Sequence, residues 1–179
     1  MTEPAFLFDG YAAVRLSSAD VAELQALHER CTDYFELIQG APTEPTSAAE
    51  DLVGLPPGKE LADKHYFGIH AADGALTGAL ELLRDWPNPG TWWLGLLMLD
   101  PPARGAGLGA RIYTAAREWV RAQGGETISL AVLEQNTQAE RFWRRLGFAE
   151  IERTPFVAST GLTSGAIIMR QRIAPAEPA

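Results

Sequence analysis

The sequence predicts one mixed α/β (α+β) domain over residues 11–173, with short tails at residues 1–10 and 174–179. The length of 179 residues fits a single domain, because domains usually contain about 100–200 residues. A composition of 46% apolar and 21% charged residues is sufficient for a hydrophobic core. The hydrophobic period also changes repeatedly between helical spacing and the patterns typical of strands.

The first third of the chain predicts a strand, a helix and a surface excursion. Residues 11–16 (YAAVRL) are typical of a short strand. Residues 17–20 (SSAD) offer N-cap side chains, and apolar residues then recur at helical spacing as far as Ile38, with a break expected near the helix end. Residues 40–59 contain four prolines and a short helical stretch near residues 47–53, and such excursions often cover a binding site.

The middle of the chain predicts strands. Residues 65–71 and 75–83 lie on either side of the turn signal Asp73-Gly74, which indicates a hairpin. Residues 91–99 (TWWLGLLML) are nearly all apolar, as in a strand covered on both faces. We therefore expect the centre of the sheet near residues 92–99.

A glycine-rich turn follows this strand. Residues 103–111 (ARGAGLGAR) open a helix that stops at the glycine pair 124–125. The remaining pattern predicts a strand, a second helix and closing strands, at residues 127–133, 137–146 and 165–173. These elements complete a mixed α/β sheet.

Composition excludes several classes of protein. The net charge of -8 repels phosphate backbones, so we expect no nucleic-acid partner. No stretch approaches the roughly 18 apolar residues that cross a bilayer, so we expect no membrane span. The start MTEPAFLFDG carries an acid and a proline where a secretory signal needs a basic end and an apolar run, which favours a cytoplasmic location. One cysteine, Cys31, and three histidines argue against a structural metal site, and we predict none.

The glycine-rich turn admits three interpretations. A strand that feeds such a turn at a helix start can bind phosphate through free N–H groups and the helix dipole, and Gly105, Gly107 and Gly109 suit this geometry. The same glycines can serve only close packing of strand against helix. Residues 105–110 (GAGLGA) also fit a dinucleotide fingerprint with Glu134 as the ribose acid, although the predicted hairpin and long first helix fit that architecture poorly.

Two motifs resemble the GNAT (Gcn5-related N-acetyltransferase) superfamily. Arg104, Gly107 and Gly109 match its Arg/Gln-x-x-Gly-x-Gly/Ala loop. A second segment is similar to its N-x-x-A…(F/L)(Y/W)…GF pattern, at Asn136, Ala139, Phe142-Trp143 and Leu146-Gly147-Phe148. The resemblance implies a mostly antiparallel central sheet with a splayed strand pair, flanked by helices.

The resemblance also implies acetyl-CoA as cosubstrate. The backbone of Leu97, Met98 and Leu99 would pair with the pantetheine arm like an added strand. The turn would hold the pyrophosphate with Arg104, Gly105, Ala106, Gly107, Leu108, Gly109 and Ala110. Asn136 would contact the cofactor, although it could instead cap the following helix.

Direct acetyl transfer needs a base for the amine, and an acid helps the thiolate to leave. The tyrosine that often supplies the acid in this family is Trp143 here, which we expect to be core or pocket wall because an indole cannot transfer a proton at neutral pH. The family's strand glutamate is also missing, with Trp93 in its place. Glu81 is the best candidate base, or else a solvated carboxylate.

Weaker candidates for the base are Tyr34 and His65, while Asp100 reads as a turn residue. The region expected to admit the acceptor is acidic, which favours a cationic amine; its acids are Asp33, Glu36, Glu44, Glu50 and Asp51. The sequence therefore predicts an N-acetyltransferase acting on a primary amine of a small molecule or peptide, with a homodimer common in the family. The alternatives are a non-catalytic acyl-CoA-binding module and, third, a dinucleotide-dependent oxidoreductase.

Overall fold

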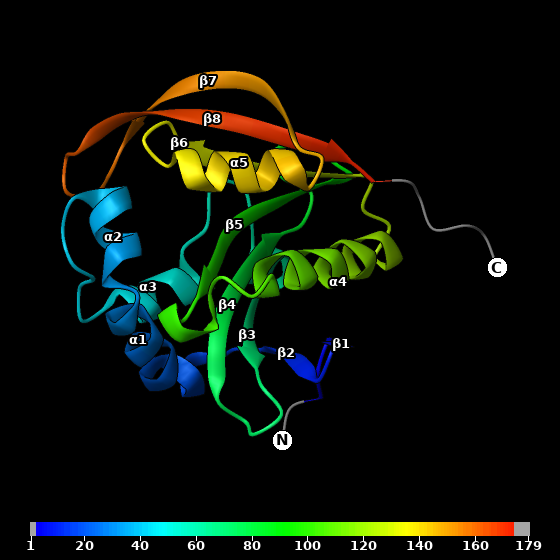
Figure 1. The fold of residues 1–179 in the computed structure, drawn as a ribbon. Coiled ribbons are helices and arrows are strands. Elements are labelled where there is room, and N and C mark those ends of the chain that lie inside the picture. The colour runs from blue at the N-terminus through cyan, green and yellow to red at the C-terminus, as the bar shows by residue number, and fades with distance from the viewer. Residues whose placement is uncertain (1–2, 174–179) are drawn as a thin grey trace.

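A computed structural model describes residues 3–173, whose strands form one eight-stranded sheet in the order β1-β2-β3-β4-β5-β6-β8-β7 (Figure 1). Among these residues the pair β5 and β6 is parallel and every other neighbouring pair is antiparallel. The strands are β1 (Phe6–Phe8), β2 (Tyr11–Arg15), β3 (Lys64–His70), β4 (Leu76–Leu83), β5 (Thr91–Leu99), β6 (Thr127–Leu133), β7 (Ala149–Val157) and β8 (Thr163–Arg172). The predicted mixed, mostly antiparallel fold is confirmed.

Helices cover both faces of this sheet. They are α1 (Val21–Arg30), α2 (Thr32–Gln39), α3 (Ser47–Val53), α4 (Leu108–Ala122) and α5 (Thr137–Arg145). The apolar sides of α4 and α5 pack with Leu80, Leu82 and Trp92 in one core. Those of α1, α2 and α3 pack with Leu96 and Met98 in a second core on the opposite face. The central sheet therefore separates two apolar layers, as the almost wholly apolar β5 requires.

Local signals placed most elements correctly. The hairpin β3–β4, the short helix α3 in the proline-rich excursion and the break in the first long helix, which falls at Cys31, are all present. The expected tail at residues 1–10 is wrong in one part, because Phe6–Phe8 form β1 and pair with β2. The Phe6 ring contacts Phe67 edge-on at 5.5 Å between centroids, so apolar burial draws this segment into the sheet. Residues 1–2 and the expected tail at 174–179 lie outside the described residues.

The central strand is irregular at Gly95. Glu81 of β4 pairs with Leu96 and Leu82 pairs with Leu94, so Gly95 is an extra residue that forms a β-bulge. Because one residue is added, the alternation of side chains reverses there: Leu94 joins the core beneath α4 and α5, whereas Leu96 joins the core beneath α1 to α3. Gly95 itself is exposed, although it lies in a central strand.

The strands β5 and β6 diverge after a short paired stretch. They pair only from Thr91 to Trp93 of β5, opposite Thr127 to Ser129 of β6. Beyond that point β6 continues against β8, and β5 continues against β4. The splayed strand pair implied by the sequence is therefore present, and it opens the centre of the sheet.

Candidate cofactor and acceptor site

A cavity of about 610 Å³ occupies the opening between the splayed strands. Its walls come from α2, the second half of β5, the glycine-rich turn, the first turn of α4 and one side of α5. Of the residues expected to bind the cofactor, all but Ala106 line it: Leu97, Met98, Leu99, Arg104, Gly105, Gly107, Leu108, Gly109, Ala110 and Asn136. The fold thus brings together segments that are separate in the sequence.

The turn before α4 presents a row of free backbone donors. Within residues 3–173, the N–H groups of residues 105–110 donate to no protein acceptor, whereas the next one, that of Arg111, donates to the Gly107 carbonyl at 3.2 Å. Gly105 and Gly107 have φ angles of 85° and 76°, which L side chains rarely adopt, and a Cβ at either would meet no heavy atom within 4 Å. The turn is therefore open, and its donors at the helix N-terminus fit a phosphate group.

The second half of β5 presents free backbone groups to the same cavity. Asp100 N–H donates to the Thr77 carbonyl at 2.9 Å. Because backbone groups alternate in direction along an antiparallel strand, the N–H and C=O of Met98 also bond to β4, whereas those of Leu97 and Leu99 point towards the opening. The Leu99 carbonyl already accepts from Arg104 Nε at 2.9 Å. In this half of β5, the groups left to pair with an extended ligand are therefore the N–H and C=O of Leu97 and the N–H of Leu99.

Arg104 joins the glycine-rich turn to α2. Its guanidinium forms a bidentate ion pair with Asp33, with Nη2 donating to Oδ1 at 3.1 Å, while Nε holds the Leu99 carbonyl. This arrangement raises the pKa of Arg104 and lowers that of Asp33, in both cases chiefly through the hydrogen bonds between them. The sequence did not predict this ion pair. The Arg104 side chain connects the end of β5 and the glycine-rich turn to Asp33 of α2.

If acetyl-CoA is the cosubstrate, as the sequence resemblance implies, we expect Arg104→Ala to raise its KM by roughly tenfold, because the loss of one charge-assisted contact costs about 1.4 kcal/mol. If the side chain acts by holding α2 against the turn, Asp33→Asn gives a similar increase. If it acts by touching the cofactor, Asp33→Asn leaves the KM unchanged. Steady-state kinetics on the two variants separates these roles.

At α5, Asn136 caps the start of the helix and Trp143 belongs to the core. Asn136 is the N-cap, with Oδ1 accepting from Ala139 N–H at 3.0 Å, so the capping role is present while the residue also lines the cavity. Trp143 is buried and packs edge-on against Tyr113 and Phe148, at 5.5 and 5.3 Å between centroids. The expectation that Trp143 is core is confirmed. The side chains of α5 that line the cavity include Gln138, Phe142 and Arg145. Their spacing of four and three residues places them on one face of the helix, and this spacing was the sequence signal that could have identified them.

Glu81 lies beside the bulge of β5. A Cβ placed on Gly95 would approach the Glu81 carboxylate to 3.0 Å, so the carboxylate covers the exposed glycine. Oε1 of Glu81 is 3.2 Å from Nζ of the buried Lys64, and this ammonium also donates to the Gly54 carbonyl at 2.7 Å. Burial raises the pKa of Glu81, and Lys64 opposes part of that rise. Glu81 is therefore a desolvated carboxylate next to an accessible stretch of central strand.

The other candidates for the base are less suitable. Tyr34 of α2 lines the cavity, but burial and the nearby charges of Asp51 and Glu81 raise its pKa, so it keeps its proton at neutral pH. His65 lies on the opposite face, where its ring packs between Trp92 and Trp119, and burial lowers its pKa to about 4. Asp100 precedes a short 3₁₀ turn and pairs with Arg30 at 2.8 Å, as a turn residue.

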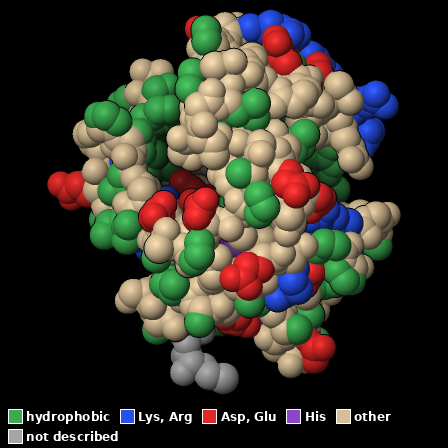
Figure 2. All heavy atoms as spheres, turned by 90° about the vertical axis from the view of Figure 1, so that its left-hand side faces the viewer, with side chains coloured by type: hydrophobic (Ala, Val, Ile, Leu, Met, Phe, Trp, Pro, Cys, Tyr) green, Lys and Arg blue, Asp and Glu red, His purple; other side chains and the backbone are tan. Residues whose placement is uncertain are grey.

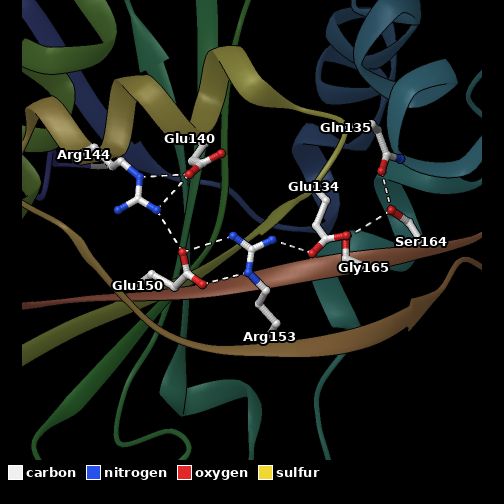
Figure 3. A network of polar contacts seen from close by, with 8 residues as sticks. All are labelled: Glu134, Gln135, Glu140, Arg144, Glu150, Arg153, Ser164 and Gly165. Atoms are coloured by element: carbon white, nitrogen blue, oxygen red, sulfur yellow. Dashed lines mark hydrogen bonds and ion pairs between the residues drawn. The ribbon is translucent and has the colours of Figure 1, made fainter.

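A polar network holds the far side of the opening (Figure 3). Arg153 of β7 bridges Glu134, which follows β6, and Glu150, at 2.6 and 2.7 Å. Glu150 also pairs with Arg144 of α5 at 2.9 Å. Ser164 of β8 donates to Gln135, whose amide donates to the Leu37 carbonyl of α2 at 3.3 Å. The hairpin β7–β8 is thus tied to both α5 and α2 around the cavity.

Residues 3–173 contain no group of three or more His, Cys, Asp and Glu side chains placed to hold a metal ion. No helix within that part of the chain has the length and apolar character needed to cross a membrane.

Comparisons with known proteins agree with this geometry. A family model described as the acetyltransferase (GNAT) family matches residues 24–148. An acetyltransferase structure from Thermus thermophilus is similar with a TM-score of 0.73 and 16% identity, over 96% of this chain and 100% of that one. No curated protein sequence matches the chain.

Two further solved structures are similar at low identity, which shows a shared fold. Spermidine N-acetyltransferase from Vibrio cholerae, in complex with CoA and spermine, has a TM-score of 0.70 and 17% identity over 92% of this chain and 96% of that one. The ribosomal-protein-S18-alanine N-acetyltransferase of Escherichia coli has a TM-score of 0.68 and 18% identity, over 93% and 96% of the two chains.

Proposed function

Because the chain belongs to the GNAT acetyltransferase family, we propose that it is a cytoplasmic N-acetyltransferase that uses acetyl-CoA. The acceptor is a primary amine of a small molecule or peptide, which attacks the acetyl group directly. The observation that carries this proposal is the cavity between the splayed strands, with its free N–H groups at residues 105–110. Two of the similar structures are N-acetyltransferases by name, and one of them is in complex with CoA.

The donors present fit such a cosubstrate. The open turn and the α4 N-terminus suit a pyrophosphate, and the backbone groups of Leu97 together with the N–H of Leu99 suit an amide-bearing arm. The amide nitrogen of Asn136 remains free for a ligand, because its oxygen makes the helix cap. When bound, acetyl-CoA supplies an acetyl thioester for transfer.

The chain's own groups supply the proton chemistry. Glu81 accepts a proton from the acceptor ammonium, since an alkyl amine is mostly protonated at neutral pH and only the neutral form attacks. Free N–H groups of β5 stabilise negative charge that develops on the reacting carbonyl oxygen. Tyr34 retains its hydroxyl proton and serves as a hydrogen-bond donor within the cavity.

A non-catalytic acyl-CoA-binding module is the second candidate. It is favoured because a buried tryptophan, Trp143, occupies the position at which the family often has a tyrosine that acts as the general acid. The dinucleotide alternative needs repeated parallel βαβ units, whereas β5 and β6 are the one parallel pair of the described sheet. The topology therefore contradicts that third candidate. A homodimer stays a prediction, which light scattering would test.

Thermal melting with acetyl-CoA, CoA and NADH tests the cofactor. A ligand at 100 times its Kd adds about 2.7 kcal/mol, and this raises the Tm of a domain of this size by several degrees. We expect acetyl-CoA and CoA to raise the Tm and NADH to leave it unchanged. Release of CoA in a screen of amines then supports transfer, whereas tight acetyl-CoA binding without release for every amine favours the non-catalytic module.

A further inference from the structure

A group of polar side chains lies beside Glu81 on the face covered by α1, α2 and α3. Asp51 of α3 has Oδ2 at 3.8 Å from Nε2 of His28, and its side chain is 43% exposed. Tyr66 of β3 lies directly opposite Glu81 of β4 in the sheet, and the charges of Asp51 and Glu81 add to burial in raising the pKa of the Tyr34 and Tyr66 hydroxyls. Figure 2 shows acidic side chains around a hollow on this face of the molecule.

Two buried polar atoms in this group have no partner among residues 3–173. They are the hydroxyl of Tyr66, a residue that is 2% exposed, and Nε2 of His28, a residue that is 0% exposed. A buried polar group without a hydrogen bond costs about 1–3 kcal/mol, so such groups usually meet a water or a ligand. The His28 atom lies 3.8 Å from Oδ2 of Asp51, and the Asp51 charge adds to burial in raising the pKa of Tyr66. These orphaned atoms indicate a binding site.

The charges at this site do not balance. Glu81 is paired with the buried ammonium of Lys64. The His28 imidazole beside Asp51 is uncharged at neutral pH, because burial lowers its pKa to about 4. Asp51 therefore has no Lys or Arg within ion-pair distance among the described residues, and burial together with the Glu81 charge raises its own pKa to about 6 against the opposing effect of the Lys64 charge. One negative charge is left for a ligand to neutralise.

The reacting amine does not neutralise it during transfer. That amine must lose its proton before it attacks, so it carries no positive charge at that moment. A second cationic group on the same acceptor would pair with Asp51, with the Tyr66 oxygen as a further acceptor for its N–H groups. We propose that Asp51 and Tyr66 form a specificity site for a second ammonium group, and that the acceptor is an aliphatic amine with two positive charges. This inference rests on the proposed acetyl transfer and names its substrate class.

Matched amines test the inference. Propylamine, butylamine and pentylamine are compared with 1,3-diaminopropane, 1,4-diaminobutane and 1,5-diaminopentane in an assay of CoA release. We expect at least one diamine to have a kcat/KM at least tenfold above that of its monoamine. Asp51→Asn removes this preference by lowering kcat/KM for the diamine about tenfold and leaving the monoamine within about twofold. Glu50→Gln, which removes an exposed carboxylate from the adjacent position of α3, keeps the preference.

Other results overturn the inference. Equal rates for diamines and monoamines exclude a site for a second charge. An equal loss for both amines in Asp51→Asn makes Asp51 part of the proton chemistry, and an equal loss of preference in Glu50→Gln indicates only general attraction by surface charge.

Calorimetry separates this inference from the proposed function. Titration of the diamine into the protein, without acetyl-CoA, is expected to show binding that Asp51→Asn weakens about tenfold. Absence of acetyl-CoA binding together with such diamine binding contradicts the proposed function and leaves the cation site in place. Acetyl-CoA binding and CoA release without any diamine preference overturn the cation site alone.

Discussion

Glu81→Gln lowers kcat by about 10²–10⁴-fold, the usual contribution of a positioned general base. The substitution keeps the shape of the side chain and removes its capacity to accept a proton. In the unmodified protein the base must be ionised, so kcat/KM falls as the pH decreases through the Glu81 pKa. Because burial raises that pKa, the acidic limb lies at higher pH than an ordinary glutamate would give. A pH–rate profile measures both effects.

Two further measurements isolate the role of Glu81. The affinity for acetyl-CoA in Glu81→Gln should equal that of the unmodified protein, since this carboxylate does not line the cavity proposed to hold acetyl-CoA. Lys64→Met should move the acidic limb to still higher pH, because Lys64 lowers the Glu81 pKa. A variant Glu81→Gln with unchanged kcat and an unchanged acidic limb shows that another group takes the proton.

Gly107→Glu weakens acetyl-CoA binding by about 10–100-fold, through the loss of charge-assisted hydrogen bonds worth about 1.5–3 kcal/mol. The new carboxylate stands at the N-cap of α4, where it competes with a phosphate for the free N–H groups and repels it. The positive φ of Gly107 adds backbone strain of about 1–2 kcal/mol in any non-glycine residue. Isothermal titration with acetyl-CoA measures the change.

Gly124→Glu is the matched control. Gly124 follows the opposite end of α4, has a φ of 82° and, like Gly107, has no heavy atom within 4 Å of a placed Cβ. The two substitutions therefore impose similar strain and the same charge change. We expect Gly124→Glu to lower the Tm comparably while leaving the Kd for acetyl-CoA unchanged. Equal Kd values for both variants would place the cofactor away from the turn.

Much of the candidate cofactor site was predictable because its signals are local. The glycine spacing at residues 105–109 and the N-cap at Asn136 each occupy a few consecutive positions, and the structure brings both to one cavity. The bulge also had a signal, since a lone glycine within a strand such as Gly95 often marks one. Its effect on which side chains face which core required the pairing with β4.

The polar groups proposed to bind the acceptor were less predictable. Lys64 and Glu81 come from neighbouring strands, but Asp51 comes from a proline-flanked excursion whose position depends on packing against α1. Arg104 and Asp33 are 71 residues apart, and no local pattern links them. The charge of His28 also depends on burial, which lowers its pKa to about 4 and leaves Asp51 without a charged Lys, Arg or His within ion-pair distance among residues 3–173.

The extra residue at Gly95 divides β5 into two halves of opposite phase. Before it, Trp92 and Leu94 face the core beneath α4 and α5; after it, Leu97 and Leu99 face that side, and Leu96 and Met98 face the other. Deleting Gly95 would therefore remove the bulge and make Leu94 and Leu96 regular neighbours opposite Leu82 and Glu81, so that every later side chain of the strand would keep its present face. The two apolar layers would then persist, and the feature lost would be the exposed glycine backbone beside the Glu81 carboxylate.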